Sequence, residues 1–439
     1  MPRIKTYDKY KDSGVEWIGE IPVYWQIDKF SRIFNRITDY VASGSFADID
    51  ANVQYLDEPD YAMLVRTADL SGTKDKRVYI NKHAYNYLSN SNLFGGELIL
   101  SNIGSVGNVY IYEPMYEHSS LAPNAIMLDG SKNNKFIYYW LINPLVNDEL
   151  KKIGGNAVQL KFNKTQLRQF KAVCPPDKEQ EQITDYLDKK CWAIDRVVET
   201  QKDIIEKLKE YKQSVITEAV TKGLDKSVPL KASGIEWIGE IPQHWEVCKL
   251  LKIFKNKKSP NANNIETNVL SLSYGNIKKR NIKNNMGLLP ETFETYNIIE
   301  PNDIVLRLTD LQNDHKSLRC GLVKEKGIIT SAYVTLELKD KTQCANYFYR
   351  LLHTFDIMKG FYGMGAGVRQ SLKFDGELCN LYIIKPTKGE QSIIAEYLDK
   401  KCAEIDNAIK DKEQLIEKLT EYKKSLIYEC VTGKRKVIE

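Results

Sequence analysis

The sequence lacks any apolar run long enough to cross a membrane and any cysteine pattern typical of secreted or zinc-binding proteins. Its apolar stretches are far shorter than the ~20 residues that a membrane helix needs, and its opening residues, MPRIKTYDKYKDSG, contain no signal-peptide core. Eight cysteines are scattered without a C-x-x-C pair, and five histidines show no metal-ligand spacing. These absences predict a cytoplasmic protein with free thiols, no metal and no membrane contact.

Catalytic motifs are missing as well. The sequence has no Walker loop, no G-x-S-x-G and no H-E-x-x-H. FYGMGAG at 361–367 resembles a methyltransferase glycine loop, but it follows a predicted helix instead of a strand, so we interpret it as a turn. Asp303 with Glu337 and Lys339 is a loose nuclease-like combination without a copy in the first half. The sequence therefore favours a binding protein whose chemistry another subunit supplies.

Positive charge is modest overall but concentrated in two stretches. The formal net charge, +5, is too small to indicate nucleic-acid binding by itself. Residues 249–283 contain nine Lys and Arg against one acid, and residues 150–171 contain six and no acid. Such stretches can neutralise phosphates, but a solvated Lys- and Asn-rich surface explains them equally well.

Two segments of the chain occur twice. SGVEWIGEIPVYWQI (13–27) returns as SGIEWIGEIPQHWEV (233–247) with 10 of 15 identities, and residues 175–223 align without a gap with 386–434 at 24 of 49 identities. The stretches between them, about 28–174 and 248–385, show no such match. Shared anchors around divergent bodies predict one scaffold that holds two different readers. We therefore divide the chain into a tail (1–12), a first body (13–174), a helix (175–222), a linker (223–232), a second body (233–385) and a second helix with a C-terminal tail (386–439).

The two C-terminal repeats predict long helices with a narrow apolar stripe. Apolar residues recur in steps of four and three, a spacing suited to coiled-coil packing. Two such helices of equal length in one chain are natural partners, and we expect them to pair antiparallel, with a pseudo-two-fold axis between the repeats. The predicted seam consists of Leu187, Cys191, Ile194, Val198, Ile205 and Leu208 in the first helix and Leu398, Cys402, Ile405, Ile409, Ile416 and Leu419 in the second.

The two bodies read as mixed α/β (α+β). Both contain strand-like pieces, then a helix-like segment (136–152 and 344–361), a Gly-rich turn and a short strand that ends at a proline. The bodies thus share an order of elements even where identity fails. We expect the repeated tryptophans, Trp17, Trp25, Trp237 and Trp245, to be core anchors.

The order of segments resembles the specificity subunit of type I restriction-modification systems over essentially the whole chain. The resemblance rests on V-E-W-I-G-E-I-P-x-x-W at 15–25 and its copy at 235–245, and on a P-P-x-x-E-Q-x-x-I-x-x-Y-L-D helix that occurs twice. The residues of the helix motif that support the resemblance are Pro175, Glu179, Gln180, Ile183 and Leu187 in the first copy and Pro386, Glu390, Gln391, Ile394 and Leu398 in the second. The second copy begins P-T-K-G-E-Q, a small departure that leaves the helix start and register intact.

The resemblance implies a non-catalytic DNA-recognition subunit. Each body would be a target recognition domain that reads one half of a bipartite, asymmetric site in double-stranded DNA. The helices would set the gap and dock two modification subunits, which methylate adenine with S-adenosylmethionine. A restriction subunit, a motor-endonuclease that uses ATP and Mg, would complete the enzyme. This chain itself would hold no cofactor.

Candidate DNA contacts follow from residue type, because Arg, Lys, Asn and Gln make base-edge contacts and cations contact phosphates. The candidates are Arg66, Lys74, Lys76, Arg77, Gln159, Lys161 and Lys164 in the first body and Lys278, Lys279, Arg280, Arg369 and Gln370 in the second. For each of them an exposed surface cation or amide is the competing interpretation. Two other functions stay open: the recognition part of a self-contained methyltransferase, and a coiled-coil interaction scaffold without DNA function. The DNA sequence and the gap length cannot be deduced.

Overall fold

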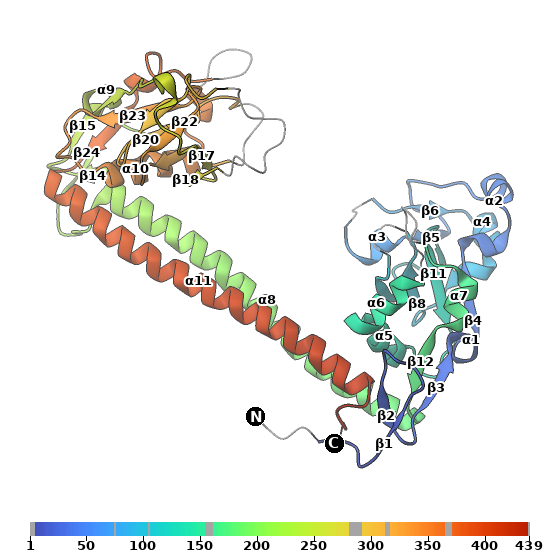
Figure 1. The fold of residues 1–439 in the computed structure, drawn as a ribbon. Coiled ribbons are helices and arrows are strands. Elements are labelled where there is room, and N and C mark those ends of the chain that lie inside the picture. The colour runs from blue at the N-terminus through green and yellow to red at the C-terminus, as the bar shows by residue number, and fades with distance from the viewer. Residues whose placement is uncertain are drawn as a thin grey trace. The chain divides into compact units, whose positions relative to one another are not determined.

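The structure, a computed structural model, describes residues 5–73, 76–103, 106–153, 161–280, 292–311, 317–364 and 371–437. It divides into two compact units, each of which combines a globular body with parts of two long helices (Figure 1). Unit 1 comprises Met1–Gln201 and Gln414–Glu439, and unit 2 comprises Lys202–Glu413. Both units mix helices and strands, which confirms the predicted fold class.

The body of unit 1 contains two four-stranded sheets that pack face to face. The first has the order β4-β11-β8-β9 and is antiparallel, and the second has the order β6-β5-β10-β7 with β5 and β10 parallel. Met63 and Leu121 of the second sheet share a core cluster with Ile99 and Met127 of the first. The strands are β4 (Arg36–Asp39), β5 (Ala62–Val65), β6 (Tyr79–Ile80), β7 (Asn92–Leu93), β8 (Leu98–Ser101), β9 (Val109–Ile111), β10 (Ser119–Leu121) and β11 (Ala125–Asp129).

Short helices cover both outer faces of this pair of sheets. The helices α2 (Phe46–Asn52) and α4 (Lys82–Tyr87) pack on the second sheet, and α5 (Asn134–Ile142) and α6 (Pro144–Lys152) pack on the first. The other helices of the body are α1 (Phe30–Ile33), α3 (Thr67–Leu70) and α7 (Lys164–Gln169).

The single helix expected over 136–152 is wrong, because the chain breaks it at Asn143-Pro144. Pro144 lacks the N–H that a continuous helix needs, and it begins α6 instead. The side chain of Asn143 accepts from the backbone N–H of Leu145 and caps the new helix.

Unit 2 repeats this framework with different outer elements. Its first sheet has the order β16-β23-β20-β21, and the helix α10 (Ala345–Ile357) packs on it. Its other strands form the antiparallel pairs β17-β18 and β19-β22, joined by a parallel bridge between Val269 and Ile328. The strands are β16 (Phe254–Asn256), β17 (Leu270–Ser273), β18 (Asn276–Lys279), β19 (Asn297–Ile299), β20 (Ile304–Leu306), β21 (Cys320–Leu322), β22 (Gly327–Ile329) and β23 (Val334–Leu338); α9 (Leu250–Ile253) precedes them.

Each body leaves and rejoins its base through two adjacent strands. In unit 1, β3 (Gln26–Lys29) pairs with β12 (Lys171–Cys174), and in unit 2, β15 pairs with β24 (Tyr382–Lys385). A hairpin lies beside each base: β1 (Tyr10–Asp12) with β2 (Glu20–Pro22), and β13 (Leu230–Ala232) with β14 (Glu240–Pro242). The strand β15 itself spans Glu246–Lys249.

The long helices are α8 (Asp177–Lys222) and α11 (Lys388–Val431). In unit 1, Ile183 and Leu187 near the start of α8 share a core cluster with Cys430 and Val431 at the end of α11, and further along, Asp195 of α8 bonds to Lys423 of α11 at 2.6 Å. In unit 2 the parts are exchanged: Val220 at the end of α8 lies in one cluster with Ile394 and Leu398 of α11, and Lys212 bonds to Asp406 at 2.6 Å. Within each unit the two helices therefore run in opposite directions.

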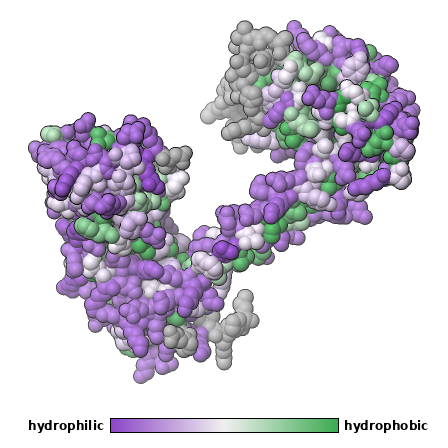
Figure 2. Space-filling model, turned by 180° about the vertical axis from the view of Figure 1, so that it is seen from behind, coloured by the Kyte–Doolittle hydropathy of each residue, from purple (hydrophilic) through white to green (hydrophobic). Residues whose placement is uncertain are grey.

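Hydrophilic residues predominate on the face of each unit seen in Figure 2, with smaller groups of hydrophobic residues between them. Among the described residues we find no helix that combines the length and the apolarity needed to cross a membrane.

Two stretches that are far apart in the sequence meet in unit 1. The backbone N–H of Lys436 donates to the carbonyl of Lys5 at 2.8 Å, and the hydroxyl of Tyr10 donates to the carbonyl of Gly433 at 3.0 Å. The segment that follows α11 thus lies against the segment that precedes β2.

Candidate nucleic-acid interface

The repeated tryptophan and glutamate form the same contact in both units. The indole N–H of Trp25 donates to Glu179 at 3.1 Å, and that of Trp245 donates to Glu390 at 3.0 Å. Both indoles are fully buried, so an unpaired N–H would be costly. Each pair ties the hairpin segment before a body to the first turn of the long helix after it. The repeated motifs thus fix how each body meets its helix.

The repeated glutamine and the second-copy threonine define where each long helix begins. Gln180 and Gln391 are buried, and each donates to the carbonyl of a proline five residues earlier, at 2.9 Å. Thr387, which replaces the second proline of the first copy, forms a capping box with Glu390: its hydroxyl accepts from the backbone N–H of Glu390 at 3.4 Å, and the Glu390 carboxylate accepts from the backbone N–H of Thr387 at 3.1 Å. The departure from P-P in the second copy therefore preserves a capped helix start.

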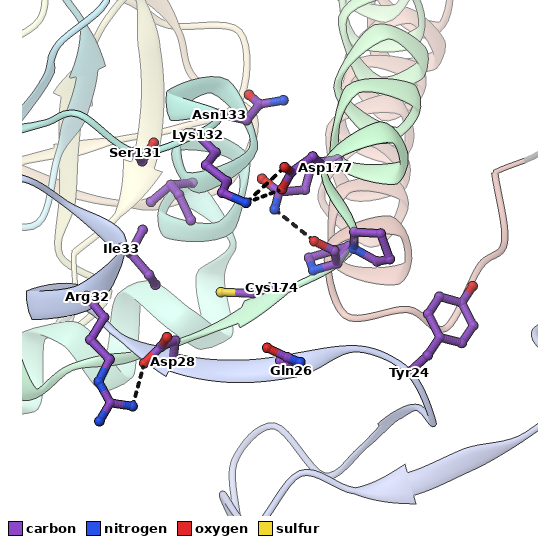
Figure 3. Close-up of a pocket in the computed structure, with 14 residues that line it drawn as sticks. Tyr24, Gln26, Asp28, Arg32, Ile33, Ser131, Lys132, Asn133, Cys174 and Asp177 are labelled. Carbon is purple, nitrogen blue, oxygen red and sulfur yellow. Dashed lines mark hydrogen bonds and ion pairs between the residues drawn. The ribbon is translucent and has the colours of Figure 1, made fainter.

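A pocket of about 360 Å³ lies at the base of the unit 1 body, between β3, β12, the start of α5 and the start of α8 (Figure 3). Lys132 reaches across it to Asp177 at 2.9 Å, and Arg32 bonds to Asp28 at 3.4 Å. Its cations are thus paired with carboxylates of the same pocket. This arrangement favours a structural junction over an anion site.

The chemistry of this pocket is not that of a nucleophile site. Cys174 lines it, and burial, with a smaller contribution from Asp28, raises the pKa of the thiol to about 11. The thiol is therefore protonated near neutral pH and is a poor nucleophile. Among the described residues there is also no group of three or more His, Cys, Asp or Glu that could hold a metal ion.

The nuclease-like combination noted in the sequence is held in ion pairs. Asp303 is buried and bonds to Lys257 at 2.8 Å, while burial raises the pKa of this carboxyl. Glu337 bonds to Lys255 at 2.9 Å, and Lys339 donates to the carbonyl of Leu251 at 2.6 Å. Lys255 and Lys257, two cations of the basic stretch 249–283, are thus paired with acids of the same body. They cannot neutralise phosphates without breaking these pairs.

Three of the candidate DNA contacts in unit 1 are engaged by nearby acids. Arg66 makes a two-pronged contact with Asp69, at 2.9 and 2.6 Å. Lys164 bonds to Asp39 at 2.8 Å, and Lys76 bonds to Asp57 at 2.9 Å while staying 71% exposed. Arg66 and Lys164 hold the body together, so they are poorly placed to read a base. Sequence reasoning missed their partners because Asp39 lies far from Lys164 along the chain, although the R-x-x-D spacing of Arg66 and Asp69 was visible.

The remaining candidates divide into exposed residues and residues that lie outside the description. Arg77 and Lys161 are exposed in unit 1. Lys278 and Lys279 are exposed on β18 of unit 2, and Arg280 after them is half-buried. Lys74, Gln159, Arg369 and Gln370 lie outside the described residues. The structure therefore places one group of candidates together, on β18 and at the residue that follows it. Sequence reasoning overlooked the alternating pattern of residues 270–279, which forms a two-stranded ribbon in the structure.

The predicted seam residues lie along the helices as follows. Leu187, Cys191, Ile194, Ile205, Leu398, Cys402 and Ile405 are buried, and Val198, Leu208, Ile409, Ile416 and Leu419 are half-buried. Figure 1 draws α8 and α11 alongside each other within each unit, which fits this burial.

Comparison with known proteins gives matches of one kind. Residues 44–216 match the family described as type I restriction modification DNA specificity domain. A proposed type I restriction enzyme MjaX specificity subunit of Methanocaldococcus jannaschii is 27% identical over 436 residues, which is 96% of each chain. The type I restriction enzyme MjaVIII specificity subunit of the same organism is 27% identical over 278 residues, covering 61% of this chain and 63% of its own length.

Solved structures show the same fold at low identity. A chain from a study of complex assembly and conformational transition of the type I R-M system has a TM-score of 0.65 at 10% identity and covers 94% of this chain and 98% of its own. The HsdS subunit from Thermoanaerobacter tengcongensis has a TM-score of 0.53 at 12% identity, with coverage of 94% and 98%.

Proposed function

We propose that the chain is a specificity subunit of a type I restriction-modification system, a DNA-recognition and not a catalytic component, and that each of its bodies reads one half of a bipartite, asymmetric site in double-stranded DNA. The observation that carries the proposal is the contrast between shared bases and divergent bodies. Trp25 with Glu179 and Trp245 with Glu390 make the same contact, whereas the segments that the bases hold share no sequence match. Two bodies that differ in sequence but are held by equivalent bases are suited to reading two different half-sites.

We propose further that α8 and α11 form an antiparallel coiled coil with pseudo-two-fold symmetry, which sets the gap between the half-sites. The ion pairs Asp195–Lys423 and Lys212–Asp406 support this, because repeat-equivalent residues exchange roles in the two units. The apolar clusters at the two helix ends are exchanged in the same way. Charge pairs beside an apolar seam are a common way to fix register.

The partners and cofactors follow from the same family. The helices would dock two modification subunits, which bind S-adenosylmethionine and methylate adenine, and restriction subunits that use ATP and Mg would cleave unmethylated DNA. This chain would contribute recognition alone, in the cytoplasm.

Exchange of one body tests this function. Residues 28–174 are replaced by the matching body of a relative, with the junctions inside the paired strands β3 and β12 so that the base is kept. The exchanged chain is assembled with modification subunits, and methylated adenines are mapped on genomic DNA. We expect one half-site to change while the other half-site and the gap stay the same.

A matched exchange of residues 248–385, between β15 and β24, is the control and should change the other half-site only. If both half-sites change together in either chimera, the bodies are not independent readers. Adenine methylation by the purified chain alone would contradict the assignment as a recognition subunit.

A further inference from the structure

The second layer of unit 2 corresponds to the second sheet of unit 1. In unit 1, β5 is parallel to β10 and antiparallel to β6. In unit 2, β17 is joined to β22 by the parallel bridge Val269–Ile328 and is antiparallel to β18. Met63 and Val65 of β5 face the first sheet, and Leu270 and Leu272 of β17 face it in the same way. The strands β17 and β18 thus take the places of β5 and β6.

The outer face of this layer differs between the units. In unit 1 it is apolar and covered, since Ala62, Leu64 and Ile80 pack in one cluster with Ile49 of α2 and Ala84 of α4. In unit 2 the residues that alternate with Leu270 and Leu272 are Ser271 and Ser273. The described chain between β16 and β17 contains only a short 3₁₀ turn (Ala262–Asn264) where unit 1 has α2. A face that α2 and α4 seal in unit 1 is therefore polar in unit 2, where Ser271 and Ser273 are half-buried and Asn276 and Lys278 are exposed.

The strands β17 and β18 form a two-stranded ribbon with one apolar and one polar face. The register pairs Ser271 with Lys278 and Ser273 with Asn276, and directly opposed residues of antiparallel strands lie on the same side. The polar face therefore presents Ser271, Ser273, Asn276 and Lys278. On the other face, Leu272 and Ile277 pack onto β21, where a Cβ on Gly321 would lie within 2.5 to 3.0 Å of them. No acidic residue occurs from 267 to 280.

The tip of the ribbon is fixed to the body. Tyr274 and Gly275 form the turn with φ of 47° and 74°, the positive values that two-residue hairpin turns need. The hydroxyl of Tyr349 on α10 donates to the carbonyl of Gly275 at 3.3 Å. A Cβ on Gly275 would lie 3.0 Å from the ring of His353, so α10 approaches the turn closely. Tyr274 itself points outward and is 74% exposed.

We propose that the β17–β18 ribbon reads base edges in the DNA half-site bound by unit 2, an inference that rests on the proposed function. The major groove of DNA admits a two-stranded ribbon. The polar face offers side chains that recognise bases there: Asn pairs with adenine, Lys with guanine, and Ser with either. The neighbouring cations Lys279 and Arg280 suit a polyanion. Because the ribbon is anchored at its tip and along its back, little ordering cost arises on binding.

The two lysines of β18 are assigned different roles by the geometry. Lys278 belongs to the polar face and reads a base, whereas Lys279 lies opposite Leu270 on the other face and can contact only the backbone. This pair supplies a matched test, because the residues are adjacent, of one charge and both exposed.

The experiment uses the full chain assembled with modification subunits and a library of DNA duplexes with random bases, from which bound molecules are selected and sequenced. The variants are Asn276→Ala, Lys278→Ala and Lys279→Ala. For Asn276→Ala and Lys278→Ala we expect the preference at one base position of one half-site to fall by roughly 5-fold to 150-fold. The other half-site should be selected as before, which reports on folding within the same molecule. For Lys279→Ala the base preferences should persist, with a weaker dependence of affinity on salt.

The inference is overturned if the unmodified assembly selects a bipartite site and both polar-face variants select the same site with the same preference. It is also overturned if Lys279→Ala relaxes a base position as strongly as Lys278→Ala does. If the unmodified assembly selects no site at all, the proposed function fails, and the inference fails with it.

Discussion

Single carboxylates at the base of each body account for much of the repeated sequence. Glu179 accepts from the indole of Trp25 at 3.1 Å and from the hydroxyls of Tyr7 and Tyr24 at 2.5 and 3.3 Å. Burial of Tyr7 and its bond to Glu179 raise the pKa of this phenol well above its usual value, so it acts as a donor at any physiological pH. One side chain thus joins the N-terminal segment, the hairpin and α8.

We expect Glu179→Ala to destabilise unit 1 by about 1–3 kcal/mol, because the buried indole N–H of Trp25 loses its acceptor. Urea unfolding of the full chain measures this loss. Glu179→Gln keeps a carbonyl acceptor and should cost less, and Glu181→Ala, at an exposed position two residues on, should cost almost nothing. Equal unfolding curves for Glu179→Ala and Glu181→Ala would contradict this role.

His353 should make the stability of unit 2 depend on pH. Burial, with a smaller contribution from Arg350, lowers the pKa of this imidazole from 6.5 to about 4, so the folded chain holds it neutral. Between these values the unfolded chain binds the proton more readily. Stability is therefore complete above about pH 6.5 and is lost as the pH falls towards 4. From pH 7 to 5 we expect a loss of about 2 kcal/mol.

The loss should be absent in His353→Gln, whose side chain does not titrate. His83→Gln provides the control, since His83 is exposed in unit 1 and should leave the pH profile unchanged. The measurement is the unfolding free energy of the three proteins from pH 4.5 to 7.5. Parallel profiles for wild type and His353→Gln would show that His353 does not cause the loss of stability.

Residue types could not show which of the candidate DNA contacts are paired with acids in the folded chain. Runs of Lys and Arg showed where cations are plentiful, but not which of them meet an acid in the folded chain. Lys164 bonds to Asp39 and Lys257 bonds to Asp303. The residues of each pair are distant in the sequence, and only the order of strands in the sheets brings them together. Asn276 and the two serines of β17 were overlooked because the alternating pattern of residues 270–279 was not recognised as a hairpin. Their alternation with Leu270, Leu272 and Ile277 around Tyr-Gly was the available signal.

At the scale of elements, the long helices were the most predictable parts because their stripes repeat over many turns. The helices of 46 and 44 residues lie within the segments 175–222 and 386–439 that the pattern predicted. Short elements were harder. The helix α7 was not anticipated, and the 136–152 helix divides at Pro144, since six to nine residues carry too few repeats to separate helix from turn.

Paired insertions test the helices as a ruler. Four residues are inserted into α8 after Gln201 and four into α11 after Glu413, the points where the chain passes between the units. Because both helices lengthen equally, Asp195–Lys423 and Lys212–Asp406 keep their register inside each unit. The added helix rises about 6 Å, close to two base-pair steps. We expect both half-sites to persist with a gap longer by one or two base pairs.

An insertion in α8 alone is the comparison, and it should lower stability because it shifts one helix against the other and separates one of the two ion pairs. Mapping of methylated adenines gives the gap directly. A folded double insertion that still methylates the original site with the original gap would show that the helices do not set the spacing.

At the scale of the whole molecule, the repeated order of segments was readable, and the pairing of strands was not. Shared motifs at 13–27 and 175–223 located two equivalent bases. The two layers of each body depend on parallel and antiparallel partners that local patterns do not specify, such as β5 with β10. The same limit hid the difference that matters most between the bodies: the outer face of the second layer is apolar and covered by α2 and α4 in unit 1, but polar on β17 and β18 in unit 2.

The meeting of residues 5–12 with 433–436 makes the covalent path of the chain almost a ring. Gly433 lies against Trp25 and Gly223 against Trp245, each with a ring carbon about 3 Å from where a Cβ would stand. After Gly433 the chain bonds to the segment near Lys5, whereas after Gly223 it continues through a covalent linker to β13. We therefore expect the position of the chain ends within this nearly closed path to have little effect on folding or on DNA recognition. A permuted gene that links the present ends and opens the chain between Gly223 and Leu230 should encode a protein with the same half-sites, the same gap and nearly the same unfolding free energy. Failure of that protein to fold would show that the covalent linker after Gly223 stabilises the fold and that the contact between Lys5 and Lys436 cannot replace it.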